Sequence, residues 1–530
     1  MCARGNSFIP CGHVVGDTNA FPPNRLSRRF HALGADSELW KRQYYSQWVH
    51  PRARRLANVQ RSDRIEYSPR VSTWLDHGHL AKEGNVTNWK RQYRLRHNWA
   101  KGLCRVTEVE FPHSPSPSVL IKLCGGFVFM ADAAHGLRVW GAKDPTNCLA
   151  NVPLSDSQGA STPHPTALAV GQIHEEREIV IGFDNGHFSR YDFDVQAGQL
   201  SRRSSHIGFG DGAITAMALS PPYLLMVSQH KILSLYNLQI GSHQTTKAGA
   251  AKEPRELASL RADNMIAPMT LSIRVSASFD IVASIVYSFF HIGCGWSLGI
   301  QELRFGKDGQ QLDSRLASTV DSQYGARPRL LQGRSPSNKR RASTVNEPLD
   351  NQDSAAPVAP SILHQQPPTS MSYSHPYLLT SHADNTLTMY LVVSNSDCLF
   401  VRGSQRLWGH TSSVSAVQVT NRGKAVSVSS RGDEIRIWEL ETTVPSLGSR
   451  RPLKEESSVQ ISPDKKPREE TGSIRAPGKM RPGISGLEFV PDASTESSHM
   501  HECIGFDEER VLLLREKSVG TQLLESYDFT

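Results

Sequence analysis

The stretch that decides the fold is Leu407–Glu441, which reads LWGHTSSVSAVQVTNRGKAVSVSSRGDEIRIWELE. Within it, Val414–Val419 (VSAVQV) alternates apolar with small or polar residues, which is the period-two pattern of a β-strand. Glycine-containing turns at Asn421–Gly423 and Arg431–Asp433 divide the stretch into three short strands. The stretch therefore predicts strands joined by turns.

Comparable strands recur along most of the chain. We expect further alternating strands at Arg105–Phe111, Ile214–Leu219 and Ile484–Phe489. Repeated short strands are typical of a β-propeller, in which about seven four-stranded blades close a ring without free sheet edges. A different β-rich fold is the alternative. The weaker copies of the unit are Phe127–Lys143, Ile179–Phe193, Leu224–Leu238, Tyr377–Val392, Cys503–Leu514 and the strands around Ile281–Leu303.

The unit Leu407–Glu441 resembles a WD repeat. It opens with Gly409-His410 and closes with Trp438-Glu439, where that family usually has Trp-Asp. The resemblance implies a mainly β chain that folds as a WD-repeat-type propeller of about seven blades, several of them degenerate.

In WD repeats a His, a Ser or Thr, an Asp and a Trp form a hydrogen-bonded chain that ties the turns of a blade together. The resemblance places His410, Ser430 and Trp438 at three of these positions. Gly432 stands where the aspartate is usual, and Asp433 follows one residue later. Because such networks stabilise only when every member is satisfied, we expect this one to be broken or displaced.

The N-terminal part of the chain differs in period and in charge. Residues 24–101 contain 17 Lys or Arg and 6 Asp or Glu, a net charge of +11 in a chain whose total is +8. Leu26, Phe30 and Leu33 lie on one helical face, Gly34 ends that helix, and Asp36 is the expected N-cap of the next. We therefore expect helices over residues 24–100, after an irregular N-terminus at residues 1–23.

Residues Asn24–Val49 resemble the C-terminal half of an F-box. Ser27–Phe30 (SRRF), Leu33 and Asp36–Lys41 (DSELWK) follow the order and spacing of that motif. The motif's front half, a Leu-Pro followed by a helix, is missing upstream. Either the gene model has lost an exon or the motif has decayed. The resemblance implies that a Skp-type adaptor, and through it a cullin scaffold, binds at Leu26, Phe30, Leu33, Leu39 and Trp40.

A repeated pentapeptide supports this resemblance. Trp40–Tyr44 (WKRQY) recurs as Trp89–Tyr93, and Asn98–Gly102 (NWAKG) precedes the first strand, as in F-box proteins with WD repeats. Five of the nine tryptophans lie between Trp40 and Trp99, and we expect them to form a small helical core. Interleaved aromatic and basic residues also occur in nucleic-acid platforms, but we do not expect nucleic acid as a partner here.

Three segments of the propeller region, residues 101–530, do not look like blades. Residues 240–256, 306–372 and 442–481 are polar and rich in Ser, Pro, Gln or charge, so we expect disordered insertions there. The 38% apolar content of the 530-residue chain agrees with this. Candidate phosphorylation sites in the insertions are Ser335, Ser343 and Ser462, by their proline or basic neighbours.

The remaining features concern compartment and membrane. The eight cysteines form no C-x-x-C pair, so we expect no metal, no cofactor and a reducing compartment, the cytoplasm or the nucleus. The first 25 residues lack a signal-peptide pattern. Ile281–Ile300 contains no Asp, Glu, Lys or Arg over 20 residues, enough to span a bilayer. Its glycines and β-branched residues instead favour two buried strands around a turn.

The sequence leaves two functions open. The F-box resemblance implies a substrate-recognition subunit of a cullin–RING ubiquitin ligase that binds unidentified target proteins through the propeller. The alternative is a WD-repeat scaffold outside ubiquitin chemistry, associated with ribonucleoproteins or chromatin. An enzyme is not expected, because the chain lacks a G-x-S-x-G elbow, a Walker loop, an H-E-x-x-H helix and a Rossmann fingerprint.

Overall fold

The structure is a computed structural model in which the chain divides into two compact units. The first comprises residues 1–98, 446–449 and 530, and the second residues 99–445 and 450–529. The residues that the structure describes are 34–50, 82–83, 86–112, 119–154, 163–173, 176–207, 212–238, 254–261, 265–276, 280–306, 309–323, 362–395, 398–430, 434–440, 458–463, 503–518 and 521–530.

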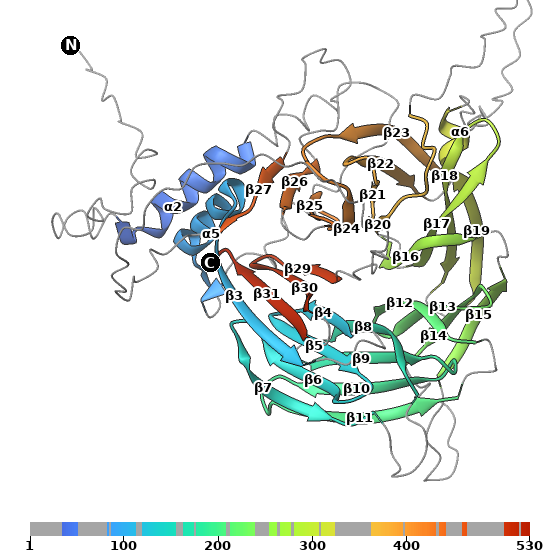
Figure 1. Ribbon diagram of the computed structural model, residues 1–530, viewed down its shortest axis with the longest axis horizontal. Coiled ribbons are helices and arrows are strands. Elements are labelled where there is room, and N and C mark those ends of the chain that lie inside the picture. Colours follow the sequence, from blue (N-terminus) through green and yellow to red (C-terminus); the bar gives the residue numbers. More distant parts are fainter. Residues whose placement is uncertain are drawn as a thin grey trace, which may run out of the picture. The chain divides into compact units, whose positions relative to one another are not determined.

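The second unit consists of seven antiparallel sheets whose inner strands contact one another around a closed ring (Figure 1). Blade 1 contains β4 (Leu120–Cys124), β5 (Phe127–Asp132), β6 (Gly136–Gly141) and β7 (Asp144–Val152). Blade 2 contains β8 (Pro165–Ile173), β9 (Glu176–Phe183), β10 (Phe188–Asp194) and β11 (Gln199–His206). Blade 3 contains β12 (Ile214–Ser220), β13 (Tyr223–Ser228), β14 (Ile232–Asn237) and β15 (Arg255–Arg261).

The next three blades follow the same order from the inner to the outer strand. Blade 4 contains β16 (Ile266–Val275), β17 (Ile281–His291), β18 (Gly295–Phe305) and β19 (Gln311–Ser318), and α6 (Thr319–Gln323) follows it. Blade 5 contains β20 (Ser370–Ser374), β21 (Tyr377–Ser381), β22 (Leu387–Ser394) and β23 (Leu399–Leu407). Blade 6 contains β24 (Val414–Val419), β25 (Lys424–Ser429), β26 (Ile435–Glu439) and β27 (Ser458–Gln460).

Blade 7 closes the ring with strands from both ends of the unit. It contains β29 (Cys503–Phe506), β30 (Arg510–Ser518) and β31 (Thr521–Asp528), with β3 (Leu103–Pro112) as the outer strand. β3 pairs antiparallel with β31 from Arg105↔Asp528 to Pro112↔Thr521, and β28 (Ser462–Pro463) adds a short parallel pairing to β3. Because the first strand completes the last sheet, the ring has no open joint.

The hydrophobic core lies between neighbouring blades. Phe129 of blade 1 packs in one cluster with Ile181 and Tyr191 of blade 2. Leu379 of blade 5 packs in another with Trp438 of blade 6. The middle strands of the blades, such as β9, β21 and β25, are buried at almost every position, so both faces of these sheets are covered by adjacent blades. The seven-bladed, mainly β fold predicted from the repeats is therefore confirmed.

The order of strands within each blade gives the ring two distinct faces. Each inner strand begins at one face, which we call the upper face. Because consecutive strands are antiparallel, the turns between second and third strands and the connections between blades also lie at the upper face. The two other turns of each blade lie at the opposite, lower face.

The insertions predicted from composition were partly wrong. Predicted insertion 306–372 contains β19 and α6 and the first residues of β20, and predicted insertion 442–481 contains β27 and β28. Predicted insertion 240–256 includes the first residues of β15. These are outer strands, an inner strand and short pairings that contain many polar residues, so their composition resembles that of a loop. Residues 362–369 are also described and form the connection into β20, whereas most of the remaining residues of the three segments lie outside the described ranges.

Two further predictions about strands have clear outcomes. Ile281–Ile300 forms β17 and the first part of β18 around a turn, as expected. The unit Cys503–Leu514 is displaced by one strand, because it spans the inner and second strands of blade 7 whereas Ile179–Phe193 spans the second and third strands of blade 2. The predicted strand Ile484–Phe489 lies outside the described residues.

The first unit contains α2 (Ser37–Tyr44), the π-helical turn η3 (Tyr45–Val49), β1 (Lys82–Glu83), β2 (Val86–Thr87) and most of α5 (Trp89–Lys101). Asp36 caps α2 by accepting from Glu38 N at 2.9 Å, as predicted. The prediction of helices throughout residues 24–100 was wrong at residues 82–83 and 86–87, which form the two paired strands β1 and β2.

The repeated pentapeptide packs against itself within this unit. The ring of Trp40 lies 5.2 Å from that of Tyr93, and the ring of Tyr44 lies 5.6 Å from that of Trp89. The first and last residues of each copy therefore meet the last and first of the other, as in two antiparallel helices. Trp40, Trp48 and Trp89 thus take part in the expected aromatic cluster, whereas Trp99 packs in the second unit and Trp74 lies outside the described residues.

Candidate protein-interaction surface

The hydrogen-bonded chain predicted for blade 6 exists with two different members. His410 Nε2 lies 2.6 Å from Ser427 Oγ, and Trp438 Nε1 donates to the same oxygen at 2.8 Å. On the other side of the imidazole, His410 Nδ1 lies 3.4 Å from a carboxylate oxygen of Glu434. All four side chains are buried. The arrangement ties β25 and β26, the upper turn between them and the connection from blade 5 together.

Glu434 takes the place of the missing aspartate. Its carboxylate accepts from Thr411 N at 2.9 Å and from Arg436 Nε at 2.7 Å. Burial alone would raise the pKa of Glu434, but these hydrogen bonds and the nearby His410 hold the pKa below its ordinary value. The carboxylate therefore stays ionised, and the network is displaced as expected.

The assignment of Ser430 to this network was wrong. Ser430 follows β25 in the upper turn, where its hydroxyl pairs with Ser413 Oγ at 2.6 Å in an exposed setting. Ser427 lies inside β25, opposite Arg436 of the neighbouring strand. The spacing of the serines from His410 and Trp438 in the sequence did not show which serine lies inside the strand. Asp433 lies outside the described residues.

Trp99 belongs to the predicted Asn-Trp-x-x-Gly motif, Asn98–Gly102, and is the first residue of the second unit. It lies at the lower face. Trp99 is buried and stacks on Phe529 with 4.0 Å between ring centroids, and its Nε1 donates to Glu508 O at 2.8 Å. Lys424 Nζ lies 4.1 Å from the centre of the Trp99 ring. Gly102 has φ +69°, and a Cβ there would lie 2.4 Å from Gln460 O. The motif therefore packs against the ends of blades 6 and 7.

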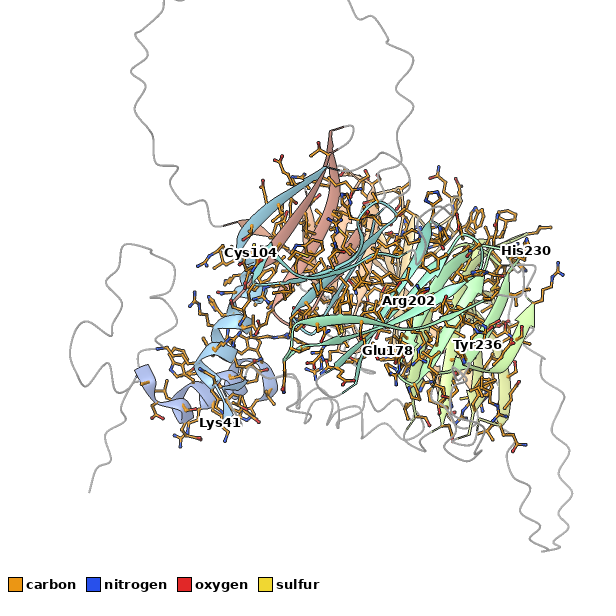
Figure 2. The ribbon with its side chains drawn as sticks, turned by 90° about the horizontal axis from the view of Figure 1, so that it is seen from below. Lys41, Cys104, Glu178, Arg202, His230 and Tyr236 are labelled. Carbon is orange, nitrogen blue, oxygen red and sulfur yellow. The ribbon has the colours of Figure 1, made fainter. Side chains whose placement is uncertain are left out.

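Buried charge joins blade 2 to blade 3. Arg190 Nε donates to Glu178 Oε1 at 3.0 Å, and Arg190 Nη1 donates to Leu238 O at 3.2 Å. Phe188 and Tyr236 pack edge to face across the same boundary with centroids 5.6 Å apart. Figure 2 shows Glu178 and Tyr236 on these adjacent sheets. The sequence did not show that Arg190 contacts a neighbouring blade.

On the upper face of blade 5 two histidines stack in parallel. The rings of His364 and His382 lie 3.9 Å apart at an angle of 3°. Burial, and then the charge of Arg406, lowers the pKa of His364 to about 4. Burial, and then His364, lowers the pKa of His382 to about 3. Both rings are therefore neutral at pH 7 and stack without charge repulsion.

The rest of the upper face carries exposed apolar side chains above blades 4 to 6. Phe290 and Ile292 lie at the turn of the β17–β18 hairpin, and Leu363 and Trp408 lie in the connections that lead into blades 5 and 6. No sequence motif identified these residues, although the uncharged run Ile281–Ile300 contains two of them. An exposed group of this kind is suited to binding another protein.

The predicted adaptor-binding residues fall only partly within the described chain. Leu39 is 36% exposed in α2, and Trp40 is half-buried with its Nε1 donating to Gly34 O at 2.9 Å. Leu26, Phe30 and Leu33 lie outside the described residues, as do the candidate phosphorylation sites Ser335 and Ser343. Ser462 lies in β28, where its backbone pairs with Leu103.

Nothing in the described ranges suggests a metal site, because they hold no group of three or more His, Cys, Asp or Glu side chains placed to bind an ion. No described helix is long and apolar enough to cross a membrane.

The fold is that of a WD-repeat-type seven-bladed propeller. Residues 104–530 match the family described as the F-box protein pof12 beta-propeller, and the chain belongs to this family. A curated relative, F-box protein pof12 of Schizosaccharomyces pombe (strain 972 / ATCC 24843), is 34% identical over 79 residues. That match covers 15% of this chain and 18% of the relative, less than a fifth of its length.

Solved propeller structures match the chain at low identity and low TM-score. The WD40 repeats of RRP9 are 9% identical, cover 79% of this chain and 100% of that chain, and give a TM-score of 0.36. The β-propeller domain of Cps50 (Swd1) from Myceliophteria thermophila is 12% identical, covers 79% of this chain and 98% of that chain, and gives a TM-score of 0.37.

Proposed function

We propose that this protein is the substrate-recognition subunit of a cullin–RING ubiquitin ligase of the Skp–cullin–F-box type. The observation that carries the proposal is the match of residues 104–530 to the propeller of an F-box family. The F-box resemblance of residues 24–49 supports it, because the two features lie in one chain in the order that an F-box protein needs.

The proposed mechanism is proximity. The N-terminal segment binds the adaptor, the propeller binds the target, and the ligase thereby holds a target lysine near a conjugating enzyme at high effective concentration. A receptor of this kind supplies binding surfaces and no catalytic group. The upper face of the propeller, with its exposed apolar side chains, supports the target-binding half of this mechanism.

Binding of a Skp-type adaptor by the full chain tests the proposal. Leu39→Asp places a charge on an exposed apolar position of α2, and we expect it to weaken adaptor binding by about tenfold or more. Arg42→Ser is the matched control on the same helix, because the Arg42 side chain is 81% exposed. Purified adaptor is captured on the immobilised full chain and quantified. A full chain that captures no adaptor contradicts the proposal.

The targets are protein substrates that bind the propeller and are then degraded. The protein acts in the cytoplasm, the nucleus or both, which imaging of a fluorescently tagged full chain checks.

A further inference from the structure

The β17–β18 hairpin projects from the upper face of blade 4. The inner strand β16 begins at Ile266, opposite Ser288, and the hairpin continues three residues further to the His291↔Gly295 pair. In blades 3, 5 and 6 the first residue of the inner strand pairs with the last residue of the second strand. At about 3.3 Å per residue, the paired strands of this hairpin continue roughly 10 Å further past the start of the inner strand than the paired strands of blades 3, 5 and 6 do.

The tip of this hairpin exposes large apolar side chains. Ile292 is 90% exposed and Phe290 is 59% exposed. Phe290 and Trp296 pair directly across the hairpin, with their rings edge to face and 6.0 Å between centroids. Isolated exposed apolar residues are ordinary, but a contiguous group at a projecting tip marks an interaction site.

The tip is held in a fixed position by the connection into blade 5. Trp296 N donates to His364 O at 2.9 Å, and a Cβ on Gly295 would lie 2.4 Å from the same oxygen and 3.5 Å from Leu363 Cδ1. His364 is itself stacked on His382. We name Phe290, Ile292, Trp296 and Leu363 the blade 4 ridge. A surface that is already ordered loses little conformational entropy when it binds a partner.

The charges around the ridge restrict what can bind it. β17, β18 and their turn contain no charged residue from Ile281 to Ile300, so a charged side chain placed there would lose its water without gaining a partner. Arg406 lies in the outer strand of blade 5 opposite Thr388, whose hydroxyl oxygen lies 3.4 Å from Nε2 of His364. Its guanidinium lies over the exposed ring of Trp408, 5.6 Å from the centroid.

Arg406 is incompletely satisfied within the described part of the chain. Its Nε is buried without a hydrogen-bond partner there, and its pair with Asp384 is long, at 3.9 Å. Asp384 directs its other carboxylate oxygen to the N–H and hydroxyl of Thr386. Because the Arg406 side chain is 28% exposed and its pair with Asp384 is long, a partner's carboxylate can reach the guanidinium and form a charge-assisted hydrogen bond there.

We propose that the blade 4 ridge and Arg406 together bind an extended segment of a partner protein that carries bulky apolar side chains and one Asp or Glu. The apolar side chains contact Ile292, Phe290 and Trp296, and the carboxylate contacts Arg406. This deepens the proposed function, on which it rests, by giving the chemistry of the target segment.

Peptide selection on the full chain tests this inference. Random dodecapeptides displayed on phage are selected on the immobilised protein, and the enriched peptides are synthesised and titrated by fluorescence anisotropy. We expect enriched peptides with at least two bulky apolar residues and an acidic residue. Ile292→Ser should weaken their binding by about tenfold or more, because an isoleucine buried on binding contributes on that scale.

Ile207→Ser is the matched control, since Ile207 is 71% exposed in another connection of the upper face, after β11. It should leave peptide binding unchanged. Arg406→Gln should weaken binding by the same factor as changing the peptide's acidic residue to its amide, and the two changes together should add nothing further. Unchanged peptide binding by Ile292→Ser, or enriched peptides without this composition, would overturn the inference.

Other occupants of the ridge give different results. If a second copy of the chain occupied the ridge, Ile292→Ser would change the sedimentation of the protein alone. If a membrane occupied it, Ile292→Ser would abolish co-sedimentation of the protein with phosphatidylcholine–phosphatidylserine vesicles. Either result without peptide binding overturns the inference. Adaptor capture reads out the proposed function separately, because Ile292→Ser should capture the adaptor as well as the parent chain does.

Discussion

Replacing Ser427 with alanine removes the oxygen on which the blade 6 network converges. Trp438 Nε1 donates to Ser427 Oγ at 2.8 Å, and His410 Nε2 lies 2.6 Å from the same atom. The ionised Glu434 carboxylate, which can only accept, faces His410 Nδ1 at 3.4 Å, so we place the ring proton on Nδ1 and let Nε2 accept from the Ser427 hydroxyl. Alanine would therefore strand a buried donor on Trp438 and a buried acceptor on His410.

The structure sets the size of this effect. Leaving a buried polar group without a partner costs roughly 1–3 kcal/mol, and two groups are affected in a core whose Trp438 ring is 0% exposed. The small space left by one hydroxyl gives the surrounding side chains little room to relax. We expect Ser427→Ala to lower the free energy of unfolding by about 2–4 kcal/mol.

Urea unfolding of the full chain measures this loss, from the shift in the midpoint at a common slope. Ser430→Ala is the matched control three residues away, because its hydroxyl pairs with Ser413 in an exposed setting. It should stay within about 0.5 kcal/mol of the parent. Equal losses in the two variants would refute the assignment of Ser427 to the network.

Three further predictions concern the core. Trp438→Ala should lower the free energy of unfolding by roughly 3–5 kcal/mol, and an unchanged melting temperature would show that the residue is not in the blade core. Replacing both His364 and His382 with phenylalanine should flatten the loss of stability on acidification. Their folded pKa values, about 4 and about 3, lie below the unfolded value near 6.5, so protonation favours the unfolded chain. We therefore expect the parent chain to lose about 2 kcal/mol of unfolding free energy per histidine between pH 7 and 5. Equal losses in the parent and the double variant, measured by urea unfolding at each pH, would contradict this. Arg190→Met should lower the free energy of unfolding by roughly 3–5 kcal/mol, because it leaves the Glu178 carboxylate buried alone. Adding Glu178→Leu should restore most of the lost free energy. A double variant as unstable as the single one would argue against this account.

The fold was predictable because its signal is local and repeated. Val414–Val419 shows its strand period in six residues, and that predicted strand matches β24 in its bounds. Outer strands such as β19 (QLDSRLAS) were missed because they lie at the rim, where most side chains are at least partly exposed and apolar residues no longer mark a buried face. Composition alone therefore placed them in an insertion.

The binding surface was less predictable, because it depends on contacts between distant residues. The uncharged run Ile281–Ile300 gave two strands, but the exposure of its tip depends on the length of β17 relative to β16. The support of that tip by His364 joins residues about 70 positions apart. Ser427 and Ser430 differ only in whether they lie inside β25 or beyond its end, which spacing to His410 and Trp438 does not resolve.

Protein half-lives after acute depletion of this chain test the central claim most directly. In cells that express the protein, turnover is measured by pulsed isotope labelling after depletion of the chain and, separately, after inactivation of the cullin. The account predicts a shared set of proteins whose half-lives lengthen in both conditions and that bind the full chain, with binding weakened by Ile292→Ser and not by Ile207→Ser. Unchanged half-lives after depletion of the chain, for every protein that binds its propeller, would contradict the account.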